Sequence, residues 1–147
     1  MSLRARIEDA TFLWQHGHRE GAFLSALVAV AATARRRFPD RKAIGDREAF
    51  ELFLSSAHSV RLSVEYRGEA HPIEHIFYKW LRCELIHEGG LPIDIEFMPD
   101  PEPGALVVRA GGSPEYILKL SNGWFEHLVG AVVGAPENTA DFKKWKM

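Results

Sequence analysis

One stretch near the middle of the chain, residues 78–90, holds most of the side chains that could do chemistry. It contains Arg82 and His87, five positions apart, together with one cysteine and two acids. An imidazole titrates near neutral pH, so it can accept or release a proton. A guanidinium group stays charged and donates paired hydrogen bonds to phosphate oxygens. This stretch is therefore the first candidate for a functional site.

The same residues are predicted to lie on a helix over residues 72–88. Pro72 suits the first turn, and Gly89 suits the left-handed position after the last. An ideal helix puts Glu84 and His87 on the inner face, whereas Arg82 points about 140° away from His87. The apolar residues of that inner face are Ile73, Ile76, Phe77, Trp80 and Cys83. We therefore expect a helix distortion or a second chain to be needed to join Arg82 and His87.

Each of these residues also has an ordinary structural interpretation. His87 would then be a partly buried histidine near a helix end, and Arg82 a surface cation. Cys83 would be a small buried hydrophobic residue, because no base is visibly placed to activate it. Glu84 would be an inner acid paired with one of the arginines at 35–37. These alternatives remain open on the sequence alone.

The other helices are read from apolar spacing and from capping residues. Ser2 caps a first helix that stops near Gly17. A second helix runs from about residue 18 to 38, before Pro39, and should be the most buried because it is apolar on most sides. A third runs from its cap, Asp46, to about residue 58. A last helix begins at Ser121 or Asn122 and ends near residue 134.

Short strands are predicted where apolar and polar residues alternate. Residues 62–66 form one extended segment, with a turn at Arg67 and Gly68. Residues 93–97, 106–109 and 116–120 form three strands joined by turns at 99–104 and 111–114, which predicts a small antiparallel three-stranded meander. The expected fold is α+β, mainly α, with four or five helices and the meander before the last helix. The tail at 135–147 is expected to be a docking arm or a frayed end.

Composition favours a single domain over residues 1–147. The helical part covers about 2–90, the meander 92–120, the C-terminal helix 121–134 and the tail 135–147. Hydrophobic residues make up 46% and charged residues 26%, values typical of a globular protein with a core. The net charge of −2 lacks the overall signature of a nucleic-acid-binding protein. Binding to nucleic acid would need a local patch, and Arg35, Arg36 and Arg37 provide one; the alternative is a solvated last helical turn.

The sequence also limits location and metal chemistry. Cys83 is the only cysteine, so an intrachain disulfide and a cysteine-based zinc site are excluded. The N-terminus lacks the pattern of a signal peptide, and the apolar run at 21–34 is too short to span a bilayer. A cytoplasmic protein without membrane contact is expected. His71 and His75 have the i, i+4 spacing of a metal pair, which leaves a metal-binding protein as a weaker alternative.

The segment Arg82-Cys83-Glu84-Leu85-Ile86-His87 resembles the R-x4-6-H motif of the HEPN superfamily. Members are small, mostly helical domains, many of them metal-independent ribonucleases of toxin–antitoxin, phage-defence and RNA-processing systems. The likeness covers mainly residues 71–90, including the glycine pair after the histidine. The alanine-rich second helix ending in arginines is similar to the early helices of that family.

The resemblance implies roles for these residues. His87 would handle a proton at the ribose 2′-hydroxyl or at the leaving oxygen, and Arg82 would stabilise charge on the phosphorane-like transition state. Cys83, Glu84 and Tyr78 would support them. Cys83 departs from the polar residue that often follows the arginine in active members. The implied protein is an RNA endonuclease that acts as a homodimer without cofactor or metal, with a possible cognate antitoxin; a non-catalytic module that binds RNA, nucleotide or protein is the alternative.

Overall fold

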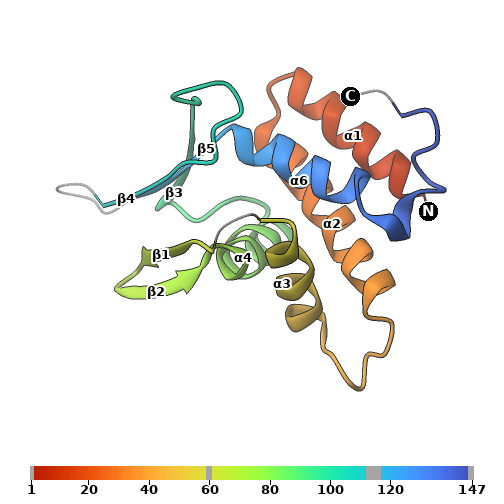
Figure 1. Ribbon diagram of the computed structural model, residues 1–147. Coiled ribbons are helices and arrows are strands. Elements are labelled where there is room, and N and C mark those ends of the chain that lie inside the picture. The colour runs from red at the N-terminus through yellow and green to blue at the C-terminus, as the bar shows by residue number, and fades with distance from the viewer. Residues whose placement is uncertain (1, 59–60, 112–116, 146–147) are drawn as a thin grey trace.

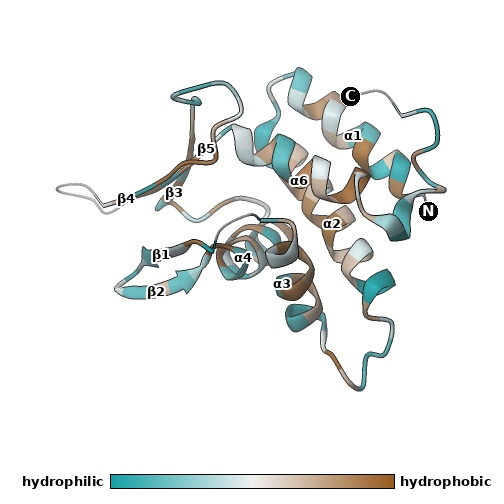
Figure 2. Ribbon diagram, in the orientation of Figure 1, coloured by the Kyte–Doolittle hydropathy of each residue, from teal (hydrophilic) through white to brown (hydrophobic). Residues whose placement is uncertain are grey.

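Helix α2 (Arg19–Arg37) lies at the centre of the fold and contacts helices on several sides (Figure 1). The computed structural model describes residues 2–58, 61–111 and 117–145. Hydrophobic colouring concentrates along α2 in Figure 2. Eight residues of α2 are buried, and its contacts confirm the expected central position of the second helix. Its hydrophobic residues with no more than 1% exposure are Ala22, Phe23, Ala26, Leu27, Ala29, Val30 and Ala34.

Three α-helices make the most extensive contacts with α2. Helix α1 (Leu3–Gln15) begins where predicted, because the Ser2 Oγ accepts a hydrogen bond from the Ala5 amide at 3.3 Å. Helix α3 (Asp46–Ser56) has Gly45 rather than Asp46 at its N-cap. Helix α6 (Gly123–Val133) brings Phe125 into stacking with Trp14 of α1, with ring centroids 4.4 Å apart. Shared burial of aromatic rings therefore joins the two ends of the chain in one core.

The helix predicted at 72–88 has nearly the expected extent but an irregular interior. It consists of α4 (Ile73–Ile76), the π-helix η1 (Phe77–Cys83) and α5 (Glu84–Glu88). Pro72 precedes the first turn instead of lying within it, and it ends strand β2 (Glu69–Pro72). Gly89 has φ 78°, the left-handed conformation expected for the cap.

Strands form two small sheets beside the helices (Figure 1). Strand β1 (Ser63–Tyr66) pairs with β2 as an antiparallel hairpin, which extends the single strand predicted there. The second sheet contains β3 (Ile95–Met98), β4 (Val108–Gly111) and β5 (Ile117–Ser121). The turn predicted at 111–114 and the start of the third strand at Tyr116 lie largely outside the described residues.

The predicted meander is wrong in its strand order. The observed order is β3-β5-β4, with β5 parallel to β3 and antiparallel to β4. Alternation of apolar and polar residues defines which face of a strand is buried but not which strand lies beside it. Here Leu118 and Leu120 of β5 are fully buried, which suits the central position. The loop before β4 is tied to α6 by Asp100, whose Oδ1 accepts a 2.6 Å hydrogen bond from the Gly123 amide.

The tail packs back on the helices as far as it is described. It contains the short 3-10 helix η2 (Pro136–Asn138), and Asn138 is fully buried. Phe142 is 8% exposed and belongs to the main core. Neither a free docking arm nor a frayed end describes residues 135–145. The reason is that the side chain of Asn138 forms hydrogen bonds with Thr33 and Arg36 near the end of α2.

Candidate functional site

The π-helix η1 contains Arg82, and α5 contains His87. In a π-helix the hydrogen bonds run from residue i to i+5, so side chains beyond it are rotated relative to those of an ideal α-helix. Such insertions occur often at functional sites. The sequence indicated that either a helix distortion or a second chain would be needed to join Arg82 and His87. The π-helix is such a distortion. It changes which way each residue of the motif faces.

His87 is exposed, which corrects the expectation that it lies on the buried face with Trp80. Trp80 is indeed buried, at 8% exposure, and lies within the π-helix. The ideal 100° spacing fails across η1, so the position of a residue after it is not given by the wheel. His87 is accordingly accessible to solvent at the end of the helix, next to the exposed Ile86.

Arg82 is half-buried and lines a pocket of about 230 Å³ between α2, α3 and the π-helix. The pocket is also lined by Val28, Ala31, Ala32, Arg35, Arg41, Asp46 and Tyr78. Three arginines therefore face one acid, and Asp46 already pairs with Arg35 at 2.9 Å. The Arg82 guanidinium lies 5.3 Å from the Tyr78 ring centroid, and its buried Nε has no hydrogen-bond partner in the described part of the chain. An oxyanion is the group that would satisfy such a pocket.

The supporting residues of the motif are divided. Tyr78 lines the pocket with Arg82. The pKa of its phenol is raised mainly by burial and, to a smaller extent, by the nearby Cys83. Cys83 and Glu84 are half-buried and do not line this pocket. The suggested pairing of Glu84 with an arginine of the 35–37 group is not observed, because those arginines pair with other acids. His87 is also absent from the pocket lining.

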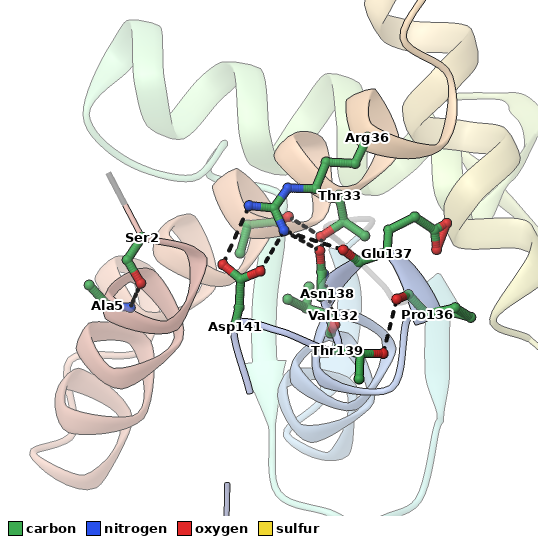
Figure 3. A network of polar contacts seen from close by, with 11 residues as sticks. Ser2, Ala5, Thr33, Arg36, Val132, Pro136, Glu137, Asn138, Thr139 and Asp141 are labelled. Carbon is green, nitrogen blue, oxygen red and sulfur yellow. Dashed lines mark hydrogen bonds and ion pairs between the residues drawn. The ribbon is translucent and has the colours of Figure 1, made fainter. Parts of the chain in front are cut away.

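The three arginines at the end of α2 all have hydrogen-bond partners within the chain. Arg35 bonds to Asp46 and to the carbonyl oxygens of residues 38 and 44. Figure 3 shows Arg36 between Asp141, at 2.7 Å, and the side chain of Asn138, at 2.9 Å. Arg37 forms a bidentate pair with Glu137, at 2.8 and 3.0 Å. Whether they contact RNA stays a prediction, but each guanidinium already has an internal partner.

The same contacts shift the acids of the tail. Hydrogen bonds from Arg37 lower the pKa of Glu137 to about 2. Hydrogen bonds from Arg36 likewise lower the pKa of Asp141. Asn138 completes the network, since its Nδ2 donates at 2.9 Å to both Thr33 Oγ1 and the Val132 carbonyl oxygen (Figure 3).

His71 and His75 lie near each other, and each has a carboxylate neighbour. Their rings are stacked at 5.3 Å, and His75 Nδ1 lies 2.7 Å from Glu51 Oε1. Among the described residues, no group of three or more His, Cys, Asp or Glu side chains is arranged to hold a metal ion.

Sequence reasoning missed a second cluster of titratable groups. His58 follows α3, Glu74 lies in α4 and His127 lies in α6. His58 Nδ1 lies 2.8 Å from His127 Nε2, and His58 Nε2 lies 3.2 Å from Glu74 Oε1. Separation by 69 residues hid the histidine pair, and neither histidine belongs to a recognisable local motif. No sequence signal would have found it.

Comparison with known proteins gives a family. The chain belongs to the Rv1289 family, which it matches over residues 2–144. Neither the curated proteins nor the solved structures contain a match to it. In the ranges that the structure describes, no helix is long and apolar enough to cross a membrane.

Proposed function

We propose that this member of the Rv1289 family is a metal-independent RNA endonuclease of HEPN type that acts as a homodimer. The observation that carries the proposal is the Arg82 pocket, in which three arginines face one acid. A phosphate group matches both the charge and the hydrogen-bonding geometry of guanidinium donors. His87 supplies the proton-transfer group five residues further on, at the solvent-exposed end of the same helix.

The composite site follows from the positions of these two residues. Arg82 lines the pocket and His87 does not, so one copy does not bring both groups to one pocket. In a dimer, His87 of one copy would meet the Arg82 pocket of the other. RNA carries its own nucleophile, the 2′-hydroxyl, so the reaction needs a base, an acid and charge stabilisation.

The first experiment is cleavage of mixed RNA in EDTA by the wild type, His87→Ala and Arg82→Ala. We expect both substitutions to abolish cleavage, whereas His18→Ala, which alters an exposed histidine outside the motif, leaves it intact. EDTA-resistant cleavage that is unchanged in His87→Ala would remove the catalytic role of this histidine.

A mixing experiment tests the composite site. Two inactive variants, Arg82→Ala and His87→Ala, are denatured together and refolded so that mixed dimers form. A mixed dimer retains one intact pair of Arg82 and His87, so activity should return. If mixed dimers are present by mass spectrometry and remain inactive, the two residues do not combine across an interface.

A non-catalytic RNA-binding module is the second candidate. The small size of the Arg82 pocket, about 230 Å³, and the absence of His87 from its lining favour it. This candidate predicts salt-dependent RNA binding that Arg82→Ala weakens, with no cleavage by any variant.

A further inference from the structure

Glu74, His58 and His127 form a chain of titratable groups in mutual contact, apart from the Arg82 pocket. The side chains of His58 and Glu74 are only 6% and 8% exposed. His58 and His127 are hydrogen-bonded at 2.8 Å, and Trp124 lies edge-on to both rings. The 3.2 Å contact of His58 with Glu74 is an ion-pair distance, although its angle is poor for a hydrogen bond. Three separate elements thus hold the two imidazoles in fixed orientations.

The chain of contacts determines where the protons lie. Burial alone would raise the pKa of Glu74, but His58, the backbone and Arg61 together lower it, so Glu74 is a carboxylate at neutral pH. The negative carboxylate 3.2 Å from His58 Nε2 favours the tautomer with the proton on that nitrogen, even though the angle is poor for a hydrogen bond. His58 Nδ1 is then an acceptor, and His127 Nε2 must donate to it. The remaining nitrogen of His127, Nδ1, carries a lone pair.

Burial and the neighbouring His58 lower the pKa of His127 and favour its neutral form. Two charged imidazoles in direct contact would repel each other, so the pair does not carry two positive charges near neutrality. In the described part of the chain, Nδ1 of His127 has no hydrogen-bond partner. His127 is therefore an oriented acceptor with a free position.

His127 lines a pocket of about 500 Å³ whose wall consists largely of small and apolar residues. Its walls include Phe53, Ala57, Gly130, Ala131, Ala135 and Pro136. Arg37 and Ser56 also line it, but the charge of Arg37 is balanced by Glu137, and Ser56 Oγ already bonds to Arg37 and to a carbonyl oxygen. The pocket thus combines an apolar surface and no net charge with one free acceptor.

We propose that this pocket is a second ligand site, in which His127 Nδ1 accepts a hydrogen bond from the hydroxyl group of a small, neutral, aromatic molecule. The acceptor His127 Nδ1 requires a hydrogen-bond donor on the ligand. The Arg37 charge is balanced by Glu137, which favours a neutral molecule. The apolar wall favours an aromatic or similarly flat group. His58 and Glu74 are positioning residues, because they hold the His127 tautomer. The site is separate from the Arg82 pocket and does not depend on RNA cleavage.

The tautomer is tested without any ligand. Long-range proton–nitrogen NMR correlations of the histidine rings distinguish Nδ1–H from Nε2–H. We expect the Nε2–H form for both His58 and His127 at neutral pH. An Nδ1–H form of His127 would overturn the proposal, because the ring would then offer a donor to the pocket.

Phenol is the binding probe, and anisole, which carries a methyl ether in place of the hydroxyl, is its matched control. Titration into ¹⁵N-labelled protein should give saturable amide shifts at Gly130 and Ala131 with phenol. Anisole should bind about fivefold to tenfold more weakly, as expected for the loss of one hydrogen bond. Equal binding of the two compounds, or no saturable shift in α6, would overturn the proposal.

Two variants connect binding to the pocket. Gly130→Leu adds a side chain at a pocket-lining position where a Cβ meets no atom within 4 Å, so it should fill the pocket and abolish the phenol shifts. His75→Gln removes another histidine that contacts a carboxylate but lies outside the pocket, and it should leave phenol binding unchanged. Retained binding in a folded Gly130→Leu protein would place the ligand elsewhere and overturn the assignment.

Discussion

The end of α2 and the π-helix both present arginines, but they use them differently. Arg36 and Arg37 are paired with acids that lie about a hundred residues further along the chain. Arg82 has an aromatic ring beside it and, within the described residues, no carboxylate at ion-pair distance. The run of arginines that looked like an RNA-contacting patch is occupied by the fold. Arg82, which has an ordinary surface interpretation on the sequence alone, lines a pocket without an ion-pair partner among the described residues.

For ligand binding, a cation without an internal partner matters more than several cations close together in the sequence. Three neighbouring cations attract acids from elsewhere in the chain, and the pairs then contribute to stability rather than to binding. A half-buried guanidinium without an anionic partner retains its capacity for a ligand. Variants at the two places should therefore separate stability from function.

Asn138→Ala should give the largest effect on stability. It removes three hydrogen bonds from a fully buried side chain that joins Thr33, Val132 and Arg36. We expect a loss of about 2–3 kcal/mol, measured by urea unfolding. Thr139→Ala, one residue further on and exposed, is the control and should change the free energy of unfolding little. Equal effects of the two changes would mean that the tail is not locked to α2.

Arg37→Ala and Arg82→Ala should separate the two regions. Arg37 loses its pair with Glu137, its bond to Ser56 and its contact with the Phe53 ring. We expect a loss of about 1–2 kcal/mol for Arg37→Ala and less than about 1 kcal/mol for Arg82→Ala, since Arg82 has no ion pair to lose in the described structure. Thermal unfolding with a known unfolding enthalpy measures both. A larger cost for Arg82 would reverse the comparison.

Acid should weaken the tail region through Glu137. Its pKa is about 2 in the folded protein and 4.5 in the unfolded reference. The unfolded chain therefore binds the proton more readily, so this stabilisation is complete above pH 4.5 and is lost as the pH falls from 4.5 towards 2. Because the pair is partly solvated, its share is about 1 kcal/mol. Glu137→Gln should show a shallower fall of stability across this window than the wild type.

The smallest effect concerns the salt dependence of RNA binding under the proposed function. Arg82→Ala should reduce the slope of log K against log salt by about one, the value for one phosphate contact. Arg37→Ala, compared at a temperature at which it is folded, should leave the slope unchanged. Filter binding at several salt concentrations measures both. If Arg37 changes the slope and Arg82 does not, the sequence-based patch is the RNA contact after all.

Local signals in the sequence predicted the helices well. Ser2 acts as a cap, Gly89 adopts the left-handed conformation, and the apolar second helix is central. These features depend on neighbouring residues, so a sequence displays them. Strand order depends instead on contacts between distant segments, and the central position of β5 was missed.

The helical segment that carries the candidate site residues was predicted from the sequence, but the directions of their side chains were not. Arg82 and His87 are on the expected helical segment, but η1 changed the direction of the residues that follow it. A π-helix depends on packing around the helix and has no simple sequence signature. The histidine pair of residues 58 and 127 shows the same limit, because only the packing of α6 near the end of α3 brings the rings together.

The position of β5 has a consequence for biosynthesis. On the ribosome the chain appears from its N-terminus, so β3 and β4 are made before β5. Neither of them pairs with the other in the sheet; both pair only with β5. A nascent chain that ends before residue 117 therefore carries two strands whose backbone groups lack their partner, and such edges favour association with other chains. The sheet can close only after β5 has emerged, which makes its formation a late step of folding during synthesis.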